Sequence, residues 1–327
     1  MLIPSMMRAV FSGMLVVAAV SVEAAGDSYP EKPIRVIVPS SPGGPADVIA
    51  RAIGDPYSRA LGQTLVFDNR AGAAGSIGAA LAARAPADGY TLLLTHSGPL
   101  VTDPFLNPNP SYDVRKDFVP ITLVGATPLL LVVNPRVAAK SVRELVGLAK
   151  KNSGKLIYAS GGNGTAIHLT MELFKSAAGI NVLHVPYKGA GPGLTALLGG
   201  EVDMMVNGLS SARPQMEAGR VRALANTAAK RSPLIPNMPT IMESGIQVDV
   251  SGWYSLLAPA GTPKPVIAKL QRALATAVNS SEANAKLAGL GIDGIGSTSE
   301  ELTRHIRIEL AKWEKAIKSI GLKPIGH

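Results

Sequence analysis

The stretch that most constrains the fold covers residues 34–51 and reads IRVIVPSSPGGPADVIAR. It opens with a short apolar, β-branched run, which is typical of a strand buried in a parallel sheet. Ser40-Ser41-Pro42-Gly43-Gly44 then breaks the strand, and Pro45 suits the first position of a helix. A strand, a glycine turn and a helix N-terminus in this order direct unpaired N–H groups and the positive end of a helix dipole toward one point. The stretch therefore predicts an anion-binding loop, which we interpret as half of a clamp for a small carboxylate.

Two more strand–loop–helix units follow, with strands expected at residues 64–67 and 90–94. A glycine-rich turn containing Gly75 and Ser76 leads into the helix of one unit, and His96 and Ser97 come directly after the strand of the other. Repeated units of this kind predict an α/β fold with a parallel sheet, and ligands usually bind at the carboxyl edge of such a sheet. We therefore expect these four residues beside the first loop.

The middle third of the chain repeats the scheme. A long apolar stretch at residues 118–133 is interpreted as a crossing into a second domain. The loop after the strand expected at 156–159 supplies hydroxyl and backbone donors for an opposing jaw, namely Ser160, Gly162, Gly164 and Thr165. Asn207 and Ser210 follow another strand expected at 202–206 and suit a cleft wall.

The last third returns to the first domain. Strands are expected at 222–226 and 251–257, and Thr298 with Glu301 forms a capping box for a terminal helix that reaches Ser319 and buries Trp313. The first domain is therefore expected to be discontinuous, with residues 26–124 and 227–327, and residues 125–226 form the inserted second domain. The ligand cleft lies between the two.

Composition excludes several classes of function. The net charge is +9, but no run of five basic residues occurs and only 4% of residues are aromatic, so nucleic acid is not an expected partner. A diffuse positive field instead attracts anionic solutes. Cysteine is absent and the five histidines lack metal-ligand spacing, so neither a metal nor a cofactor is expected. Gly75-Ser76-Ile77-Gly78 lacks the leading glycine of a nucleophile elbow.

Residues 1–25 are typical of an export signal. Arg8 precedes an apolar segment at 9–22, and small residues permit cleavage near Ala24 or Ala25. The apolar segment is too short to span a bilayer comfortably. We therefore expect a periplasmic protein, which we take to be a monomer.

Some candidate residues permit two interpretations. Asp47 lies in a first helical turn with Arg51 four residues later, so an ion pair at the helix start competes with ligand contact. His168 either packs against the backbone or touches ligand. Lys188 either supplies a positive charge to the cleft or is solvated. Gly43 and Gly44 either make a tight turn or approach a carboxylate closely.

Several motifs together resemble one family. They are Pro42-Gly43-Gly44 with Asp47 and Arg51, Asn69-Arg70-Ala71-Gly72, residues 160–168, Val185-Pro186-Tyr187-Lys188-Gly189, and Gly199-Gly200-Glu201-Val202-Asp203. In this order they resemble the Bug family, the periplasmic receptors of tripartite tricarboxylate transporters. The resemblance implies a two-domain, type II periplasmic-binding-protein fold, each domain a mixed, mostly parallel sheet flanked by helices. It also implies a small carboxylate ligand, such as a di- or tricarboxylate, an acidic amino acid or an aromatic acid, and a membrane permease as partner.

The chain departs from many relatives at Asn207, where they carry an acidic residue, and at His96, so the ligand cannot be inherited from any one relative. Two other functions stay open. One is a ligand-sensing receptor of a signalling system. The other is a secreted hydrolase that uses Ser76 or Ser97 with His96 or His168.

Overall fold

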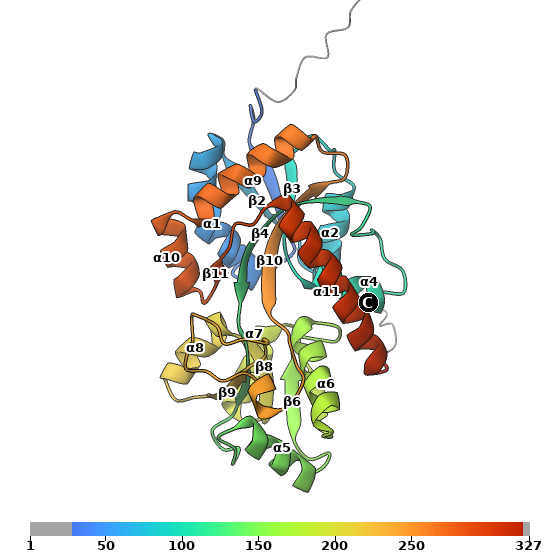
Figure 1. Ribbon diagram of the computed structural model, residues 1–327, viewed down its shortest axis with the longest axis vertical. Coiled ribbons are helices and arrows are strands. Elements are labelled where there is room, and N and C mark those ends of the chain that lie inside the picture. Colours follow the sequence, from blue (N-terminus) through green and yellow to red (C-terminus); the bar gives the residue numbers. More distant parts are fainter. Residues whose placement is uncertain (1–27, 323–327) are drawn as a thin grey trace, which may run out of the picture.

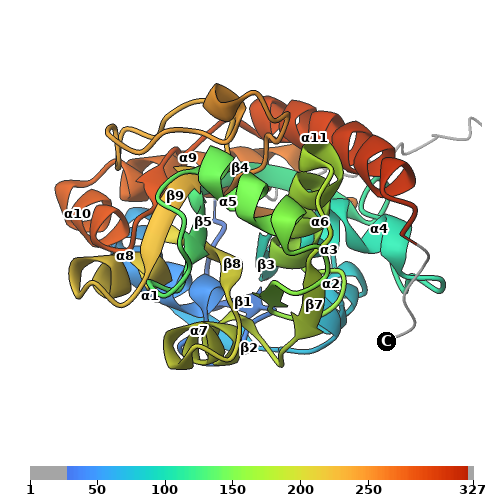
Figure 2. The same ribbon diagram turned by 90° about the horizontal axis from the view of Figure 1, so that it is seen from below.

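The computed structural model describes residues 28–322 and shows two lobes stacked along the long axis of the molecule (Figure 1). Each lobe is built on one β-sheet with helices on both faces (Figures 1 and 2). This confirms the predicted two-domain α/β fold. The export signal expected at residues 1–25 lies outside the described residues.

The first lobe draws its strands from both ends of the chain. In spatial order, its six strands within residues 28–322 are β11 (Asp293–Gly294), β4 (Phe118–Thr127), β10 (Gly252–Pro259), β3 (Thr91–His96), β1 (Ile34–Val38) and β2 (Leu65–Asn69). The second lobe draws its strands from the middle of the chain. In spatial order, its five described strands are β7 (Leu183–Pro186), β6 (Ile157–Ser160), β8 (Met204–Gly208), β5 (Leu129–Val133) and β9 (Arg222–Asn226).

Helices cover both faces of each sheet, as Figure 2 shows for the second lobe. Those of the first lobe are α1 (Pro45–Leu61), α2 (Ser76–Ala83), α3 (Gly98–Val101), α4 (Asp103–Leu106), α9 (Lys264–Val278), α10 (Ser281–Gly289), α11 (Ser299–Ser319) and the 3₁₀ turn η1 (Ala73–Gly75). Those that follow β5 in the middle of the chain are α5 (Val142–Lys151), α6 (Ala166–Ala178), α7 (Ala190–Gly199), α8 (Leu209–Glu217) and the 3₁₀ turn η2 (Met242–Ser244).

Burial on both faces explains the continuous apolar run of β1. Val36 and Val38 pack in one core with α1 and α9, whereas Ile37 points to the opposite core beside α2 and α3. Successive strand side chains point to opposite faces, so a sheet covered on both sides needs apolar residues at successive positions. The strand and helix predicted from residues 34–51 are confirmed.

Local helix signals were also reliable. Thr298 and Glu301 form the expected capping box of α11, and the Ser141 side chain accepts the Glu144 N–H at the start of α5. Trp313 is buried in the core, as its position on the apolar face of α11 predicts.

The strand directions agree with the predicted mixed, mostly parallel sheets. Parallel pairing is confirmed for β1 with β2 and β3, and it also joins β6 to β7 and β8. However, β10 runs antiparallel to both β3 and β4, and β5 runs antiparallel to both β8 and β9. The sheets are therefore mixed, and among the described strands only β10 and β11 of the first lobe and β5 of the second run against the others.

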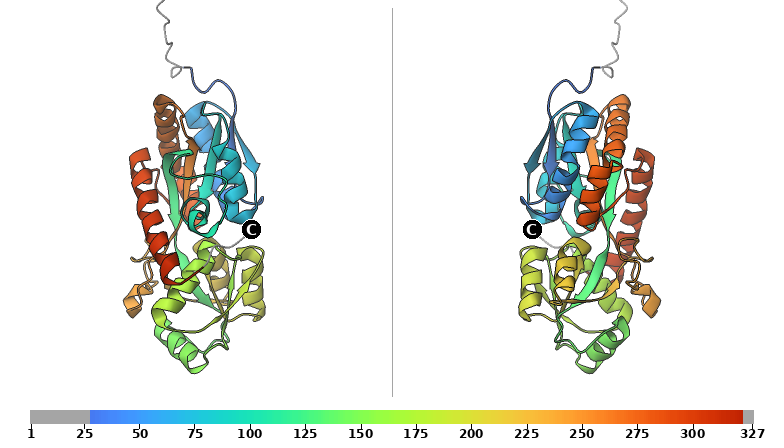
Figure 3. Two further views of the ribbon diagram at one scale, coloured as in Figure 1. Left: turned by 90° about the vertical axis from the view of Figure 1, so that its right-hand side faces the viewer. Right: turned by 90° about the vertical axis from the view of Figure 1, so that its left-hand side faces the viewer.

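The two crossings between the lobes lie side by side. The outgoing one is at Pro128, between β4 and β5 (green in Figure 3). The Thr227 N–H donates to the Leu129 carbonyl at 2.8 Å, and the Val250 N–H donates to the Thr227 carbonyl at 2.9 Å. Thr240 pairs with Asn226 at the end of β9. We therefore propose that residues 227–250 belong with the second lobe and that the return crossing lies near residue 251 rather than 226.

Candidate functional site

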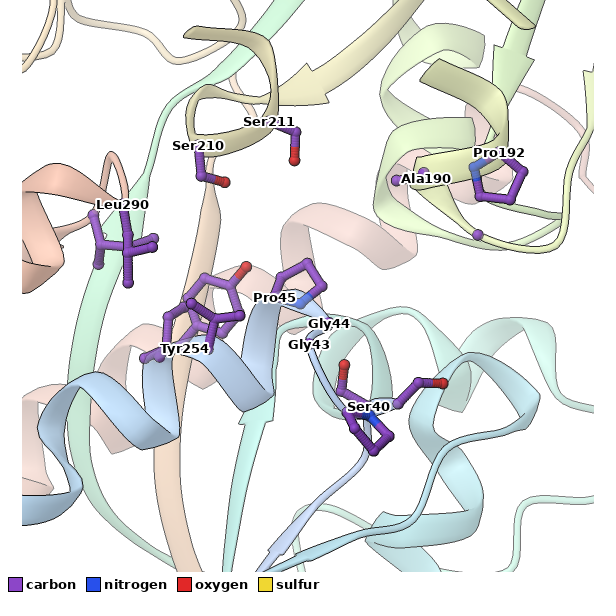
Figure 4. A pocket seen from close by; sticks show the side chains of 17 residues that line it. Ser40, Gly43, Gly44, Pro45, Ala190, Pro192, Ser210, Ser211, Tyr254 and Leu290 are labelled. Atoms are coloured by element: carbon purple, nitrogen blue, oxygen red, sulfur yellow. The ribbon is translucent and has the colours of Figure 1, made fainter. Parts of the chain in front are cut away.

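Two adjoining cavities lie between the lobes. The larger, of about 580 Å³, is enclosed by the β1–α1 loop below and by the first turns of α7 and α8 above (Figure 4). The Ser210 and Ser211 side chains of the second lobe face Ser40 and Tyr254 of the first lobe across it (Figure 4). Its remaining wall is apolar and comes mainly from Val48, Ile49, Pro192, Leu290 and Ile292.

The smaller cavity, of about 260 Å³, lies closer to the crossings between the lobes. His96 ends β3 and Ser97 follows it, Thr165 precedes α6, and Asn207 is the penultimate residue of β8. Residues 127, 129 and 252 of the two crossings also line this cavity. Ser40, Pro45, Gly189, Ala190, Ser210, Ser211 and Tyr254 line both cavities, so the two form one continuous site.

Three helices begin at this site without a side-chain cap. Among residues 28–322, no side chain accepts a hydrogen bond as the N-cap of α1, α7 or α8, whose N-cap residues are Gly44, Gly189 and Gly208. Uncapped first turns leave N–H donors unpaired and carry the positive end of the helix dipole. Their convergence from both lobes makes the site suited to an anion.

The β1–α1 loop is held by Asp47 from inside the protein. The Asp47 carboxylate accepts the Gly43 N–H at 2.8 Å, Arg51 Nε at 3.0 Å and Asn69 Nδ2 at 3.1 Å. Burial alone would raise the pKa of Asp47, but the hydrogen bonds from Arg51, Gly43 and Asn69 hold it below its ordinary value. The ion pair with Arg51 is confirmed, and Asp47 lines neither cavity.

His96 is a neutral donor at the smaller cavity. The Gly98 N–H donates to His96 Nδ1 at 3.1 Å, so the neutral ring carries its proton on Nε2. Burial lowers the pKa of His96 to about 4. At neutral pH the ring can therefore give a ligand a hydrogen bond but no positive charge.

The jaw loop after β6 is stabilised by two stacked histidines. Ser160 Oγ lies 2.7 Å from His184 Nε2 and accepts the Gly162 N–H, while His168 Nδ1 accepts the Gly164 N–H at 3.1 Å. The His168 and His184 rings stack with their centroids 4.3 Å apart. Ser160, Gly162, Gly164 and His168 line neither cavity, whereas Thr165 lines the smaller one. The structure thus places most of the predicted jaw residues behind the cleft wall.

These histidines predict acid sensitivity. Burial lowers the pKa of His184 from 6.5 to about 4 and also lowers the pKa of His168. Between these pH values His184 binds more protons in the unfolded chain, so its contribution to the free energy of unfolding is most favourable above pH 6.5 and is lost as the pH drops toward 4. We expect His184→Gln to flatten this dependence by up to about 1.4 kcal/mol per pH unit in urea unfolding from pH 7 to pH 4. An unchanged slope in the variant would contradict this assignment.

Other predicted site residues lie elsewhere. Ser76 lines a separate cavity beside α2 that also contains Arg70 and Arg84, and Gly75 lines neither interlobe cavity. Lys188 is exposed and outside both linings, although its neighbour Gly189 lines both. Within residues 28–322, no hydrogen bond joins Ser76 or Ser97 to His96 or His168, as a serine hydrolase would need.

The remaining predicted residues are brought together. Ser40, Ser41, Gly43, Gly44 and Ser210 line the larger cavity, and His96, Ser97, Thr165 and Asn207 line the smaller one. The prediction missed Ala190 and Pro192, which lie in the first turn of α7, and Ser211, which follows the predicted Ser210 on α8. It also missed Leu290 and Ile292, which follow the unpredicted helix α10. The serine at the start of α10, Ser280, accepts the Ala283 N–H and was a usable signal.

Among residues 28–322, no three His, Asp or Glu side chains are grouped as metal ligands. None of the helices in this part of the chain combines the length and hydropathy needed to cross a bilayer.

Two α/β lobes that enclose a donor-rich cleft define a solute-binding protein. Residues 49–322 match the family model described as tripartite tricarboxylate transporter family receptor. The chain therefore belongs to this family of receptors, which are not enzymes.

The relatives agree with this assignment. A UPF0065 protein in the tcbD-tcbE intergenic region of Pseudomonas sp. (strain P51) is 40% identical over 293 residues, covering 89% of this chain and 87% of its own. Protein BugT of Bordetella pertussis is 35% identical over 317 residues, covering 96% and 97%.

Solved structures agree as well. R. palustris Rpa4515 with adipate has a TM-score of 0.84 at 34% identity and covers 91% of this chain and 100% of its own. MatC from Rhodopseudomonas palustris with bound malate has a TM-score of 0.80 at 31% identity and covers 88% and 100%.

Proposed function

We propose that this protein is a periplasmic receptor that captures a small carboxylate between its lobes and delivers it to the permease of a tripartite tricarboxylate transporter. The observation that carries the proposal is the convergence of the uncapped N-termini of α1, α7 and α8 on one cleft. Donors in that cleft are backbone N–H groups, serine hydroxyls and neutral side chains, which hold a carboxylate without a full counter-charge.

The site comes from both lobes, so binding favours closure. Ser40 and Tyr254 belong to the first lobe, and Ala190 and Ser210 belong to the second. A ligand that bonds to both lobes stabilises the state in which they approach, and the adjacent crossings at Pro128 and Val250 supply the hinge. The closed form then presents both lobes together to the permease.

The sequence of residues 1–25 supports the periplasmic location, and the solved relatives support the class of ligand. Cleavage of an export signal near Ala24 or Ala25 would release residues 26–327 into the periplasm. Solved relatives that carry adipate and malate support a carboxylate as ligand.

Isothermal titration tests the proposal with adipate, malate, succinate, citrate and benzoate. We expect at least one to bind with micromolar or tighter affinity and to raise the unfolding temperature. Adipamide, which has the shape of adipate without its charge, is the matched control and is expected not to bind. Failure of every acid, or equal binding of adipamide and adipate, would overturn the proposal.

A further inference from the structure

One buried donor beside the smaller cavity has no partner. Asn207 is 2% exposed and lines this cavity. Its Oδ1 accepts the Gly208 N–H at 2.9 Å, which fixes the orientation of the amide. Within residues 28–322 no acceptor pairs with its Nδ2. A buried amide donor without an acceptor is costly, so an oxygen supplied by a ligand would stabilise this wall of the cleft.

The walls that residues 28–322 form around both cavities carry no charged side chain. No Asp, Glu, Lys or Arg among residues 28–322 lines either of them. The acidic residue on the β1–α1 loop, Asp47, is 1% exposed and already accepts hydrogen bonds from Gly43, Arg51 and Asn69. His96 also faces the smaller cavity as a neutral donor. Hydrogen-bond acceptors with negative charge are therefore missing where a ligand would lie.

We propose that the cleft selects organic acids that lack an ammonium group, and that Asn207 sets this selectivity by donating Nδ2–H to an oxygen of the ligand. This inference rests on the carboxylate-receptor function proposed above. An ammonium group beside Asn207 would meet another donor and the positive ends of helix dipoles, with no carboxylate to compensate for its lost hydration. An oxygen in the same place accepts the free N–H.

Matched pairs of probes test the selectivity of the natural protein. L-Malate carries a hydroxyl group where L-aspartate carries an ammonium group. Adipate carries a hydrogen atom where L-2-aminoadipate carries an ammonium group. In isothermal titration at pH 7 we expect the amine-free member of at least one pair to bind about 30-fold or more tightly than its partner.

Asn207→Asp tests the residue itself. The carboxylate is nearly the same shape and can still accept the Gly208 N–H, but the free donor becomes a negatively charged acceptor. We expect the affinity ratio within the pair to fall by about tenfold or more, through weaker binding of the amine-free acid. Asn181→Asp is the matched control, because Asn181 is exposed in the second lobe and the change in net charge is the same. It is expected to leave the ratio unchanged.

The outcomes separate this inference from the proposed function. If no acid binds, both fail. If acids bind equally well with and without the ammonium group, or if Asn207→Asp keeps the natural ratio, the receptor function stands and the selectivity proposal is overturned. Urea unfolding of each variant shows whether it folds, and if Asn207→Asp does not, the ratio measured for the natural protein decides the proposed ligand class.

Discussion

Asp47→Ala is expected to lower the free energy of unfolding by about 2–4 kcal/mol and to abolish measurable binding of whichever acid the natural protein binds in the titration proposed above. The Asp47 carboxylate, which is 1% exposed, is the shared acceptor for the Gly43 N–H, Asn69 Nδ2 and Arg51 Nε, so its removal takes three hydrogen bonds from this loop at once. The Arg51 side chain is 58% exposed, so the ion pair itself contributes little of the loss. Most of the lost stability comes from the β1–α1 loop, because Gly43 and Asn69 no longer donate hydrogen bonds to residue 47.

Asp55→Ala is the matched control for this prediction. Asp55 lies on the same helix, α1, but is exposed. An exposed substitution of this kind is expected to change the free energy of unfolding by no more than about 0.5 kcal/mol. Urea unfolding and isothermal titration of both variants make the comparison. Equal stability and binding in the two variants would mean that Asp47 does not hold the loop.

Gly44→Ala is expected to weaken carboxylate binding by about 30-fold or more with a smaller effect on stability. A Cβ at Gly44 would lie 2.2 Å from Ser40 Oγ and 2.9 Å from the Ser41 carbonyl oxygen. The hydroxyl can rotate away, but the carbonyl accepts the Gly44 N–H at 2.8 Å and closes the turn. The loop must therefore shift, and with it the start of α1, which lines the larger cavity.

Gly147→Ala in α5 is the control for the glycine change. Its Cβ would meet no atom within 4 Å, and residue 147 lines neither cavity. Alanine in a helix interior is expected to raise the free energy of unfolding by up to about 1 kcal/mol and to leave binding unchanged. Isothermal titration with the acid that the natural protein binds compares the two variants, and natural affinity in Gly44→Ala would show that the turn does not position the site.

Together these variants separate two roles within one loop. Gly44 shapes the surface that faces the larger cavity, whereas Asp47 holds the same backbone from the protein interior. A carboxylate beside a carboxylate-binding site would repel the ligand if it were exposed there. Because Asp47 lies behind the loop and pairs with Arg51, an acidic residue at this position is compatible with the proposed anion site.

Site residues were predictable where local signals decide them. The glycine turn at residues 40–44 and Pro45 gave the β1–α1 loop, and this loop lines the larger cavity. The jaw loop at 160–165 was placed correctly after its strand, but sequence could not show that Ser160 and His168 turn inward to His184 and the loop backbone. That choice depends on His184, which lies on the neighbouring strand β7 and 24 residues away from Ser160 in the chain.

The small-residue start of α7 shows a second limit. Gly189-Ala190-Gly191 has no apolar periodicity, so residues alone did not indicate a helix there. In the fold, a Cβ on Gly161 would lie 3.1 Å from the Ala190 nitrogen, so the jaw loop and α7 pack closely only because both are small. Tertiary packing of this kind overrides weak local preference.

The sequence by itself determined the α/β class, the strand and glycine turn before α1, and the capped starts of α5 and α11, because each depends on residues a few positions apart. Only the tertiary structure decided that the uncapped starts of α1, α7 and α8 meet in one cleft and that Asn207 keeps an unpaired N–H beside it. These features depend on segments more than 100 residues apart, which the crossings at Pro128 and Val250 bring face to face. Short-range hydrogen bonding and hydrophobic pattern carry no information about that distance.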